Sequence, residues 1–314
     1  MSKLLDSTIP IFSLADLQNG TRKEDFQRCL SEKGVFYLTD HGIQECEYQN
    51  FETTTIDFFS NASDQDRVEL SNKNPATRRG FSGLESESTA KITATGSYTD
   101  YSMCYSMGVS NNVFPSTAFE QIWTKHFKNL DKLAKITATE VLQCNSVRAT
   151  DFLLNCDPVL RFRSFPEVPE NRCAENEPLR MAPHYDISIV TLINQTKCPN
   201  GFVSLQCNID GVFVELPPLP NAFIVMCGAV ASYLTGGQVK APIHRVVAPS
   251  REQRVGSNRT SNVFFLRPGR EFELTVKEAK ACGLNIDADS VTITFQDWIG
   301  GNYRNLKTSE GETV

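Results

Sequence analysis

The sequence contains no apolar run long enough to cross a membrane. Its longest nearly apolar stretch, residues 222–234, is interrupted by Gly228 and Ser232. A membrane-spanning helix needs about 20 consecutive apolar residues. We therefore expect this stretch to form a buried strand followed by a turn, and we expect no membrane partner.

A secretory signal is also lacking, and so is any metal-binding pattern of cysteines. Residues 1–10 include no apolar core of the kind that a signal peptide carries. None of the 10 cysteines is paired with another at the spacing of a zinc finger. Scattered cysteines without a secretory signal are typical of reduced thiols. We therefore expect a cytoplasmic protein whose cysteines are small core residues.

Excess positive charge is absent as well. The 314 residues include 31 Lys and Arg against 37 Asp and Glu, which gives a formal net charge of −6. Such a chain has no bulk attraction for nucleic acid or for an anionic membrane surface. With 40% hydrophobic and 22% charged residues, the composition is that of an ordinary globular protein. A cluster of basic residues in this background is therefore expected to be local and specific.

The first part of the chain shows mostly helical patterns. Apolar side chains recur every three or four residues from Phe119 to Val141, which predicts a long helix that braces a sheet. Shorter helices are predicted at residues 22–33, at 45–59 and from Ser63 onward, with one strand at 35–38. Residues 77–108 are polar and rich in Gly, Ser and Thr, so they could hold short strands or a mobile loop.

From residue 159 onward, short apolar runs alternate with Gly, Pro and Asn turns. The predicted strands are residues 159–165, 187–193, 202–206, 212–216, 223–227, 245–247, 259–267 and 272–276, before a last helix at 294–303. Short strands at this spacing favour a sandwich or jelly roll. The expected fold is mainly β with helices: a helical N-terminal section, residues 1–157, packs on a jelly-roll core, residues 158–314, as one structural unit.

Histidine is scarce, which narrows the search for a metal site. Of the four histidines, His184 lies two residues before Asp186, and His244 follows in a distant predicted strand. Residues i and i+2 of a strand point to the same face, so the imidazole and the carboxylate can converge on one ion. Two histidines and one carboxylate form the facial triad of non-haem iron(II) oxygenases, which leaves coordination positions open. The alternative is that these are ordinary polar residues, as we expect for His41 in a turn and His126 in the long helix.

A strand that carries two arginines follows His244. Alternation along residues 259–267 places one set of side chains on a common face: Arg259, Ser261, Val263, Phe265 and Arg267. A planar guanidinium and a hydroxyl two residues apart suit the far carboxylate of a dicarboxylic acid, whose keto-acid end would chelate iron. The order H-x-D, then His, then R-x-S indicates an oxygenase site far more specifically than any one of these motifs alone. The alternative is that residues 259–267 form a surface strand whose arginines have no role in a site.

With these motifs, the chain resembles the iron(II)- and 2-oxoglutarate-dependent oxygenases, and within them the branch that expands the penicillin ring. The likeness runs over nearly the whole chain, and its long segments are more specific than the triad. The matching segments are residues 33–39, 78–81, 83–89, 100–108, 179–186, 200–206, 264–268 and 298–303.

The resemblance implies a double-stranded β-helix core and a set of ligands for its cofactors. By position, His184, Asp186 and His244 would hold iron(II), and Arg259 and Ser261 would bind 2-oxoglutarate. Dioxygen would take the last open position on the metal.

The resemblance also implies a site for a small anionic substrate. Arg161, Arg163 and Arg267 would face the carboxylates of a penicillin-like molecule. Alternation puts Arg161 and Arg163 on one strand face, and paired cations on an inner face need anions. The candidates for the apolar wall of this site are Met181, Val263 and Phe265.

The implied reaction is ring expansion of a penicillin to a cephem in antibiotic biosynthesis. Hydroxylation of a cephalosporin-like or other small carboxylate is the alternative, and one sequence does not separate the two. Two positions depart from the pattern of this branch: Met226 stands where a phenylalanine is expected, and Lys307 lies in a tail that is usually richer in arginine. These departures leave undecided which side chain the preferred substrate carries. Two further alternatives are a non-catalytic binding module and a zinc hydrolase. The combination of the triad with Arg259 and Ser261 argues against both.

Overall fold

The computed structural model describes residues 9–71, 79–93, 95–176, 178–284, 286 and 289–306. Its larger sheet has eight strands in the order β1 (Ile11–Ser13), β2 (Val35–Thr39), β10 (Phe223–Cys227), β7 (Val190–Gln195), β12 (Arg259–Leu266), β5 (Val159–Phe165), β4 (Met103–Gly108) and β3 (Gly80–Ser82). The smaller sheet has the order β6 (Leu179–His184), β11 (His244–Val247), β8 (Leu205–Ile209) and β9 (Val212–Glu215). A separate pair consists of β13 (Glu273–Thr275) and β14 (Thr292–Thr294).

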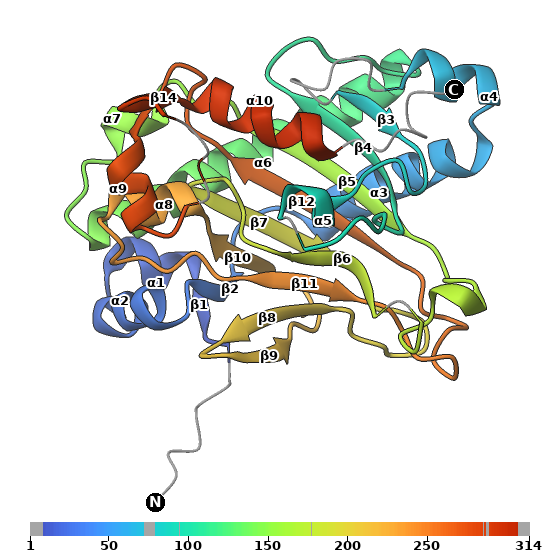
Figure 1. Ribbon diagram of the computed structural model, residues 1–314, viewed down its shortest axis with the longest axis horizontal. Coiled ribbons are helices and arrows are strands. Elements are labelled where there is room, and N and C mark those ends of the chain that lie inside the picture. Colours follow the sequence, from blue (N-terminus) through green and yellow to red (C-terminus); the bar gives the residue numbers. More distant parts are fainter. Residues whose placement is uncertain are drawn as a thin grey trace, which may run out of the picture.

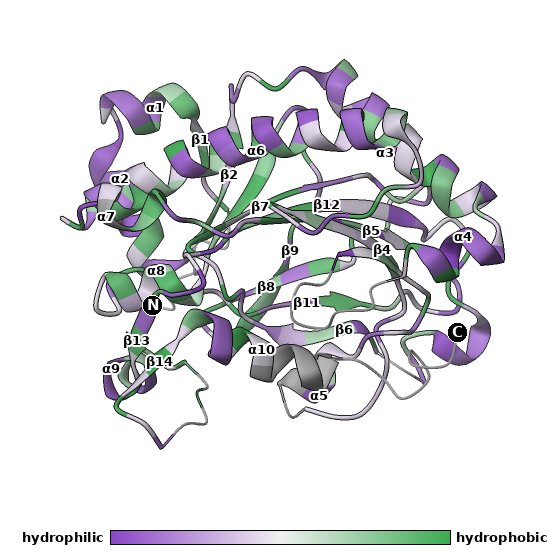
Figure 2. Ribbon diagram, turned by 90° about the horizontal axis from the view of Figure 1, so that it is seen from above, coloured by the Kyte–Doolittle hydropathy of each residue, from purple (hydrophilic) through white to green (hydrophobic). Residues whose placement is uncertain are grey.

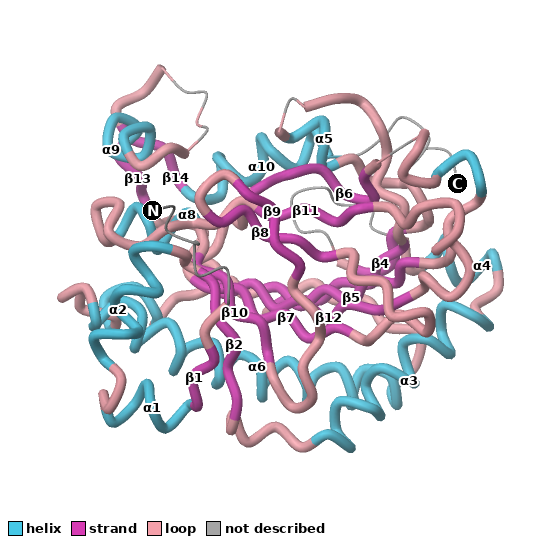
Figure 3. The backbone as a smooth tube through the Cα atoms, turned by 90° about the horizontal axis from the view of Figure 1, so that it is seen from below, coloured by secondary structure: helices cyan, strands magenta, loops and turns pink. Residues whose placement is uncertain are grey.

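The two sheets lie face to face, as the views along their edges show (Figures 2 and 3). This arrangement confirms the predicted jelly-roll core. The larger sheet continues into the N-terminal part of the chain, since β1, β2, β3 and β4 flank the core strands (Figure 1). The N-terminal section therefore adds strands to the sheet as well as helices, and the division of the chain at residues 157 and 158 stays a prediction.

Helices surround the sheets. They are α1 (Leu14–Asn19), α2 (Lys23–Glu32), α3 (Glu45–Asn61), α4 (Asp64–Glu69), α5 (Thr89–Ile92), α6 (Thr117–Cys144), α7 (Thr150–Leu153), α8 (Ala229–Leu234), α9 (Val276–Ala281) and α10 (Phe295–Leu306), with a 3-10 turn at Glu170–Arg172. Most lie on the outer side of the larger sheet, whereas α5 and α10 lie beside the smaller sheet, where α5 packs against β6 and against α10 (Figure 2). The long helix α6 packs against β7 and β12, as predicted. Among the helices of the described part, none is long and apolar enough to span a bilayer.

Two helix boundaries follow directly from local sequence signals. Gly34, directly after α2 and its C-cap residue Lys33, has a φ of +66°, a left-handed conformation that glycine adopts without a steric penalty. Ser63 begins α4 with a capping box, in which its side chain accepts from the Asp66 amide and the Asp66 carboxylate accepts from the Ser63 amide.

Some expectations about secondary structure were wrong in detail. Residues after Gly228 form the helix α8 instead of a turn, because six residues are too few for helical periodicity to stand out in an apolar run. The strand expected at 187–193 begins only at Val190, since residues 185–189 form a loop. Strands β1, β3, β4, β6 and β14 were not specifically predicted. Residues 77 and 78 lie outside the described residues.

The main core lies between the outer face of the larger sheet and helices α3 and α6. Trp123 of α6 is fully buried, and its indole N–H donates to the Thr55 hydroxyl of α3 at 3.1 Å. The imidazole of His126 stacks on Phe51 with ring centroids 4.1 Å apart, which confirms that His126 is a residue of the long helix. Because this face of the sheet is filled by helices, the opposite face is left to form a cavity against the smaller sheet.

Candidate active site

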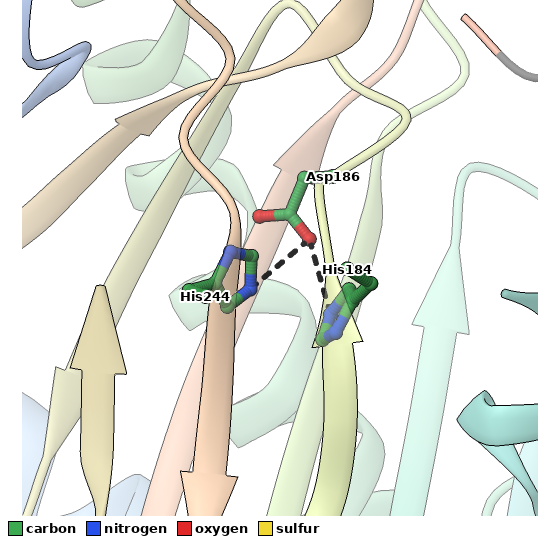
Figure 4. A group of neighbouring side chains, drawn as sticks. All are labelled: His184, Asp186 and His244. Carbon is green, nitrogen blue, oxygen red and sulfur yellow. Dashed lines mark ion pairs between the residues drawn. The ribbon is translucent and has the colours of Figure 1, made fainter. Parts of the chain in front are cut away.

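His184, Asp186 and His244 converge at the end of the smaller sheet (Figure 4). His184 is the last residue of β6 and pairs directly with His244, the first residue of β11. Oδ1 of Asp186 lies 3.8 Å from Nε2 of His184 and 3.7 Å from Nε2 of His244. Asp186 itself lies in the loop after β6, so the expectation that a single strand carries both His184 and Asp186 was wrong, although their convergence was predicted.

The surroundings of the three side chains suit a metal ion. Nδ1 of His184 lies 2.8 Å from the Ala182 carbonyl, and Nδ1 of His244 lies 3.3 Å from the Pro242 carbonyl. A proton on each Nδ1 leaves the Nε2 lone pairs directed toward Asp186, which is how metal-binding histidines are commonly oriented. Burial lowers the pKa of His184 to about 4, so its imidazole is neutral at pH 7.

The carboxylate of Asp186 gives a further reason to expect an ion. The residue is buried, and its Oδ2 atom has no hydrogen-bond partner among the residues that the structure describes. A buried carboxylate oxygen without a partner is costly. A divalent cation bound by this carboxylate and the two imidazoles would remove that cost, and two nitrogens with one oxygen are the donor set of a non-haem iron(II) site. In the part of the chain that the structure describes, this is the only group of side chains placed to hold a metal.

The loop that carries Asp186 is held by the residues that follow β10. The Ala229 amide donates to the Asp186 carbonyl at 2.8 Å, and the Gly228 amide donates to the Ile189 carbonyl at 3.0 Å. Gly228 approaches Ser188 so closely that an added Cβ atom would collide with the Ser188 carbonyl oxygen. The absence of a side chain at Gly228 therefore sets the position of the Asp186 loop.

Replacing Gly228 with alanine is expected to lower stability by about 1–3 kcal/mol, the usual cost of overpacking a tight site. The displaced loop should also weaken iron binding, because Asp186 moves with it. The melting temperature and the iron(II) titration would be compared with those of Gly83→Ala, whose added Cβ meets only an ordinary contact with Phe81. Equal behaviour of the two variants would contradict this account of the loop.

A cavity of about 440 Å³ lies between the two sheets and includes the triad. Every residue expected on the inner face of the predicted strand 259–267 lines it, together with the candidates from β5 and β6. The predicted site residues along its wall are Arg161, Arg163, Met181, His184, Asp186, His244, Arg259, Ser261, Val263, Phe265 and Arg267. The structure thus brings the whole predicted set to one cavity.

Arg259 is held in this cavity by neutral partners. Its Nε donates to the Ser204 hydroxyl at 2.6 Å, its Nη1 donates to the Gln195 side-chain oxygen at 2.8 Å, and its guanidinium lies 4.4 Å from the ring centroid of Phe165. Burial, with a smaller effect of the Arg180 charge, lowers its pKa to about 9, so the group is still a cation at pH 7. Within the described residues no carboxylate pairs with Arg259. The arrangement suits an anionic ligand beside Ser261.

Ser204 and Gln195 were not predicted as partners of Arg259. Gln195 of β7 lies directly opposite Ser261 of β12. The sequence alone does not show that these two strands are neighbours, but with that pairing known, Gln195 could have been predicted beside the Arg259 face. Ser204 belongs to one of the segments that carry the resemblance, but its contact with Arg259 spans 55 residues of sequence.

Arg161 and Arg163 do not depend on a ligand for their negative partner, because the chain supplies one. Nη2 of Arg161 lies 2.8 and 2.9 Å from the two carboxylate oxygens of Glu87, and Nη2 of Arg163 lies 3.0 Å from one of them. All three side chains are at least nine-tenths buried. Glu87 was not predicted as a site residue, although it lies in the matching segment 83–89.

Not every residue that bears on the resemblance lines the cavity. Met226 is fully buried in a cluster that also includes Met181, and it is not part of the cavity wall. Arg79 lies beside Asp157, with Nη2 3.9 Å from Oδ1, and also does not line the cavity. Arg78 and Lys307 lie outside the described residues.

Comparison with known proteins shows to which class of oxygenase the chain is similar. Residues 156–268 match the 2OG-Fe(II) oxygenase superfamily, and residues 9–126 match the family described as non-haem dioxygenase in morphine synthesis N-terminal. The chain is 50% identical over 310 residues to a deacetoxycephalosporin C synthase of Amycolatopsis lactamdurans, covering 97% of this chain and 98% of that protein. It is also 50% identical over 306 residues to a deacetoxycephalosporin C hydroxylase of Streptomyces clavuligerus, covering 96% of each.

Solved structures show the same fold at much lower sequence identity. A full-length protein of Neurospora crassa, crystallised in complex with alpha-KG and 5-formyluracil, superimposes with a TM-score of 0.76. The two chains are 18% identical, and the match covers 94% of this chain and 95% of that one. This similarity therefore concerns the architecture alone.

Proposed function

This chain belongs to the 2OG-Fe(II) oxygenase superfamily, and from that premise we propose that it expands the ring of a penicillin-like β-lactam to a cephem. Iron(II) and 2-oxoglutarate are its cofactor and cosubstrate. The observation that carries the proposal is one cavity that is lined both by the three candidate iron ligands and by three arginines, Arg161, Arg163 and Arg267. The near full-length identity to a deacetoxycephalosporin C synthase supports the same reaction.

The residues that line the cavity form three groups, each with its own role. His184, Asp186 and His244 would hold iron(II), which supplies the oxidation of the substrate that is coupled to decarboxylation of 2-oxoglutarate. Arg259 and Ser261 would bind the far carboxylate of 2-oxoglutarate and so fix the orientation of its keto-acid end.

The third role is to place the substrate. Arg161, Arg163 and Arg267 would bind a carboxylate of the β-lactam and hold the reacting carbon near the metal. Met181, Val263 and Phe265 would form the apolar wall that keeps water from the reacting carbon. Proximity and exclusion of water are thus the contributions of this chain's own side chains.

Hydroxylation of a cephalosporin-like substrate is the second candidate. It is favoured by a specific observation, since the hydroxylase of Streptomyces clavuligerus is as similar to this chain as the synthase of Amycolatopsis lactamdurans. Both reactions can start with the removal of hydrogen from carbon in the same cavity. They differ in what is made, so the product decides between them.

Incubation with iron(II), 2-oxoglutarate and a penicillin is expected to yield succinate and a product lighter than the penicillin by two hydrogens. The product would be measured by mass spectrometry, and a reaction without 2-oxoglutarate is the blank. A parallel reaction with a cephem tests hydroxylation, which adds one oxygen. A hydroxylated product alone would overturn the proposed expansion, and no β-lactam-dependent succinate would overturn both candidates.

A further inference from the structure

A buried carboxylate, that of Glu87, contacts both arginines of β5. Glu87, in the segment between β3 and α5, is 6% exposed and contacts Arg161 and Arg163 at the distances given above. Arg161 and Arg163 line the active-site cavity, whereas Glu87 does not. The carboxylate therefore acts on the cavity through the two guanidiniums.

Hydroxyl groups in the neighbouring strand β4 and directly before it complete the fixation of both guanidiniums. Nη1 of Arg163 donates to the Ser102 hydroxyl at 2.8 Å, and Nε of Arg161 donates to the Ser106 hydroxyl at 3.1 Å. Ser106 pairs directly with Arg161 across β4 and β5. Each guanidinium is thus held at two edges by protein groups, which fixes its orientation at the cavity.

The backbone around Glu87 is fixed as well. The Asp100 amide donates to the Glu87 carbonyl at 2.8 Å, and the carboxylate of Asp100 accepts from the amide of Thr89 at 3.0 Å and from its hydroxyl at 2.6 Å. The Tyr101 amide in turn donates to the Arg180 carbonyl of β6 at 3.2 Å. The Glu87 carboxylate is therefore placed before any ligand arrives, which is the requirement for a preorganised site.

We propose that Glu87 is a positioning residue that holds Arg161 and Arg163 side by side so that together they bind one carboxylate of the substrate. Two adjacent cations repel each other, and a carboxylate shared between them offsets this repulsion and sets their spacing. Removing the shared carboxylate lets the guanidiniums separate or turn toward other anions. The inference rests on the proposed function, because it assigns a role in binding the same substrate.

The test compares a penicillin as the free acid with its methyl ester in Glu87→Gln. Glutamine keeps the size of the side chain but loses the charge. The preference of the enzyme for acid over ester, as the ratio of the two kcat/KM values, is expected to shrink on the order of tenfold, as when one charge-assisted contact is lost. Glu87→Asp retains the carboxylate and is expected to recover part of the preference.

A purely structural role of Glu87 would lower both kcat/KM values equally and leave their ratio unchanged, and that result would overturn the inference. Glu85→Gln is the matched control, since Glu85 lies two residues away, pairs with Arg172 and is not part of the cavity wall. The charge-transfer band of iron(II) with 2-oxoglutarate, recorded without oxygen, reports whether each variant retains its metal centre.

Two further outcomes are distinguishable. If Glu87→Gln does not fold, Ser102→Ala takes its place, because it removes the hydroxyl that also holds Arg163. A reduced preference for the acid in Ser102→Ala supports the inference, and an unchanged preference overturns it. If the unaltered enzyme acts on neither acid nor ester, the proposed function itself fails and the inference fails with it. A normal wild-type reaction with an unchanged ratio in the variants overturns the inference alone.

Discussion

His184→Ala is expected to lose almost all succinate formation from 2-oxoglutarate. Alanine removes one of the two imidazoles that converge with Asp186, and two remaining ligands do not make a facial triad. Since the metal contributes several kcal/mol to the reaction, the rate should fall by roughly 10³-fold. Anaerobic titration with iron(II) and 2-oxoglutarate should also show no charge-transfer band, which separates loss of the metal from loss of the substrate.

His41→Ala is the matched control for this experiment. His41 lies in the loop between β2 and α3, its ring packs 4.7 Å from that of Phe223, and it does not line the active-site cavity. This variant should keep both the band and the rate of succinate formation. Retention of both properties by His184→Ala would mean that the metal lies elsewhere.

The metal centre could be predicted from the sequence because its signal is local. His184 and Asp186 are two residues apart, and scarcity of histidine left few choices for the third ligand. The inner face of β12 was predictable for a similar reason, since strict alternation in one long strand determines which side chains share a face. In both cases a short stretch of chain contains most of the information.

The partners of the site residues could not be predicted in the same way. Glu87 contacts Arg161 and Arg163 across 74 and 76 residues of sequence, and neither spacing has a periodic signature. The paired arginines indicated that an anion is needed, and the structure shows that the chain itself provides one. The helix α8 was missed for a different reason, because an apolar run of six residues looks the same whether it forms a buried helix or a buried turn.

Arg259→Gln is expected to raise the KM for 2-oxoglutarate by about 10- to 100-fold, because hydrogen bonds to a charged group contribute about 1.5–3 kcal/mol. Glutamine is shorter and neutral, so it cannot form the two parallel bonds that a guanidinium makes with a carboxylate. The triad is untouched, so the maximal rate at saturating 2-oxoglutarate should change much less than the KM. Initial rates of succinate formation over a range of 2-oxoglutarate concentrations measure both quantities.

The control for charge alone is Arg245→Gln, since Arg245 on β11 pairs with Gln206 and lies outside the cavity wall. Its KM for 2-oxoglutarate should equal that of the unaltered enzyme. A 2-oxo acid without the far carboxylate sharpens the test: the unaltered enzyme should strongly prefer 2-oxoglutarate, and Arg259→Gln should lose most of that preference. A full preference in Arg259→Gln would show that another cation binds the far carboxylate, and Arg259 would then be a structural residue held by Ser204 and Gln195.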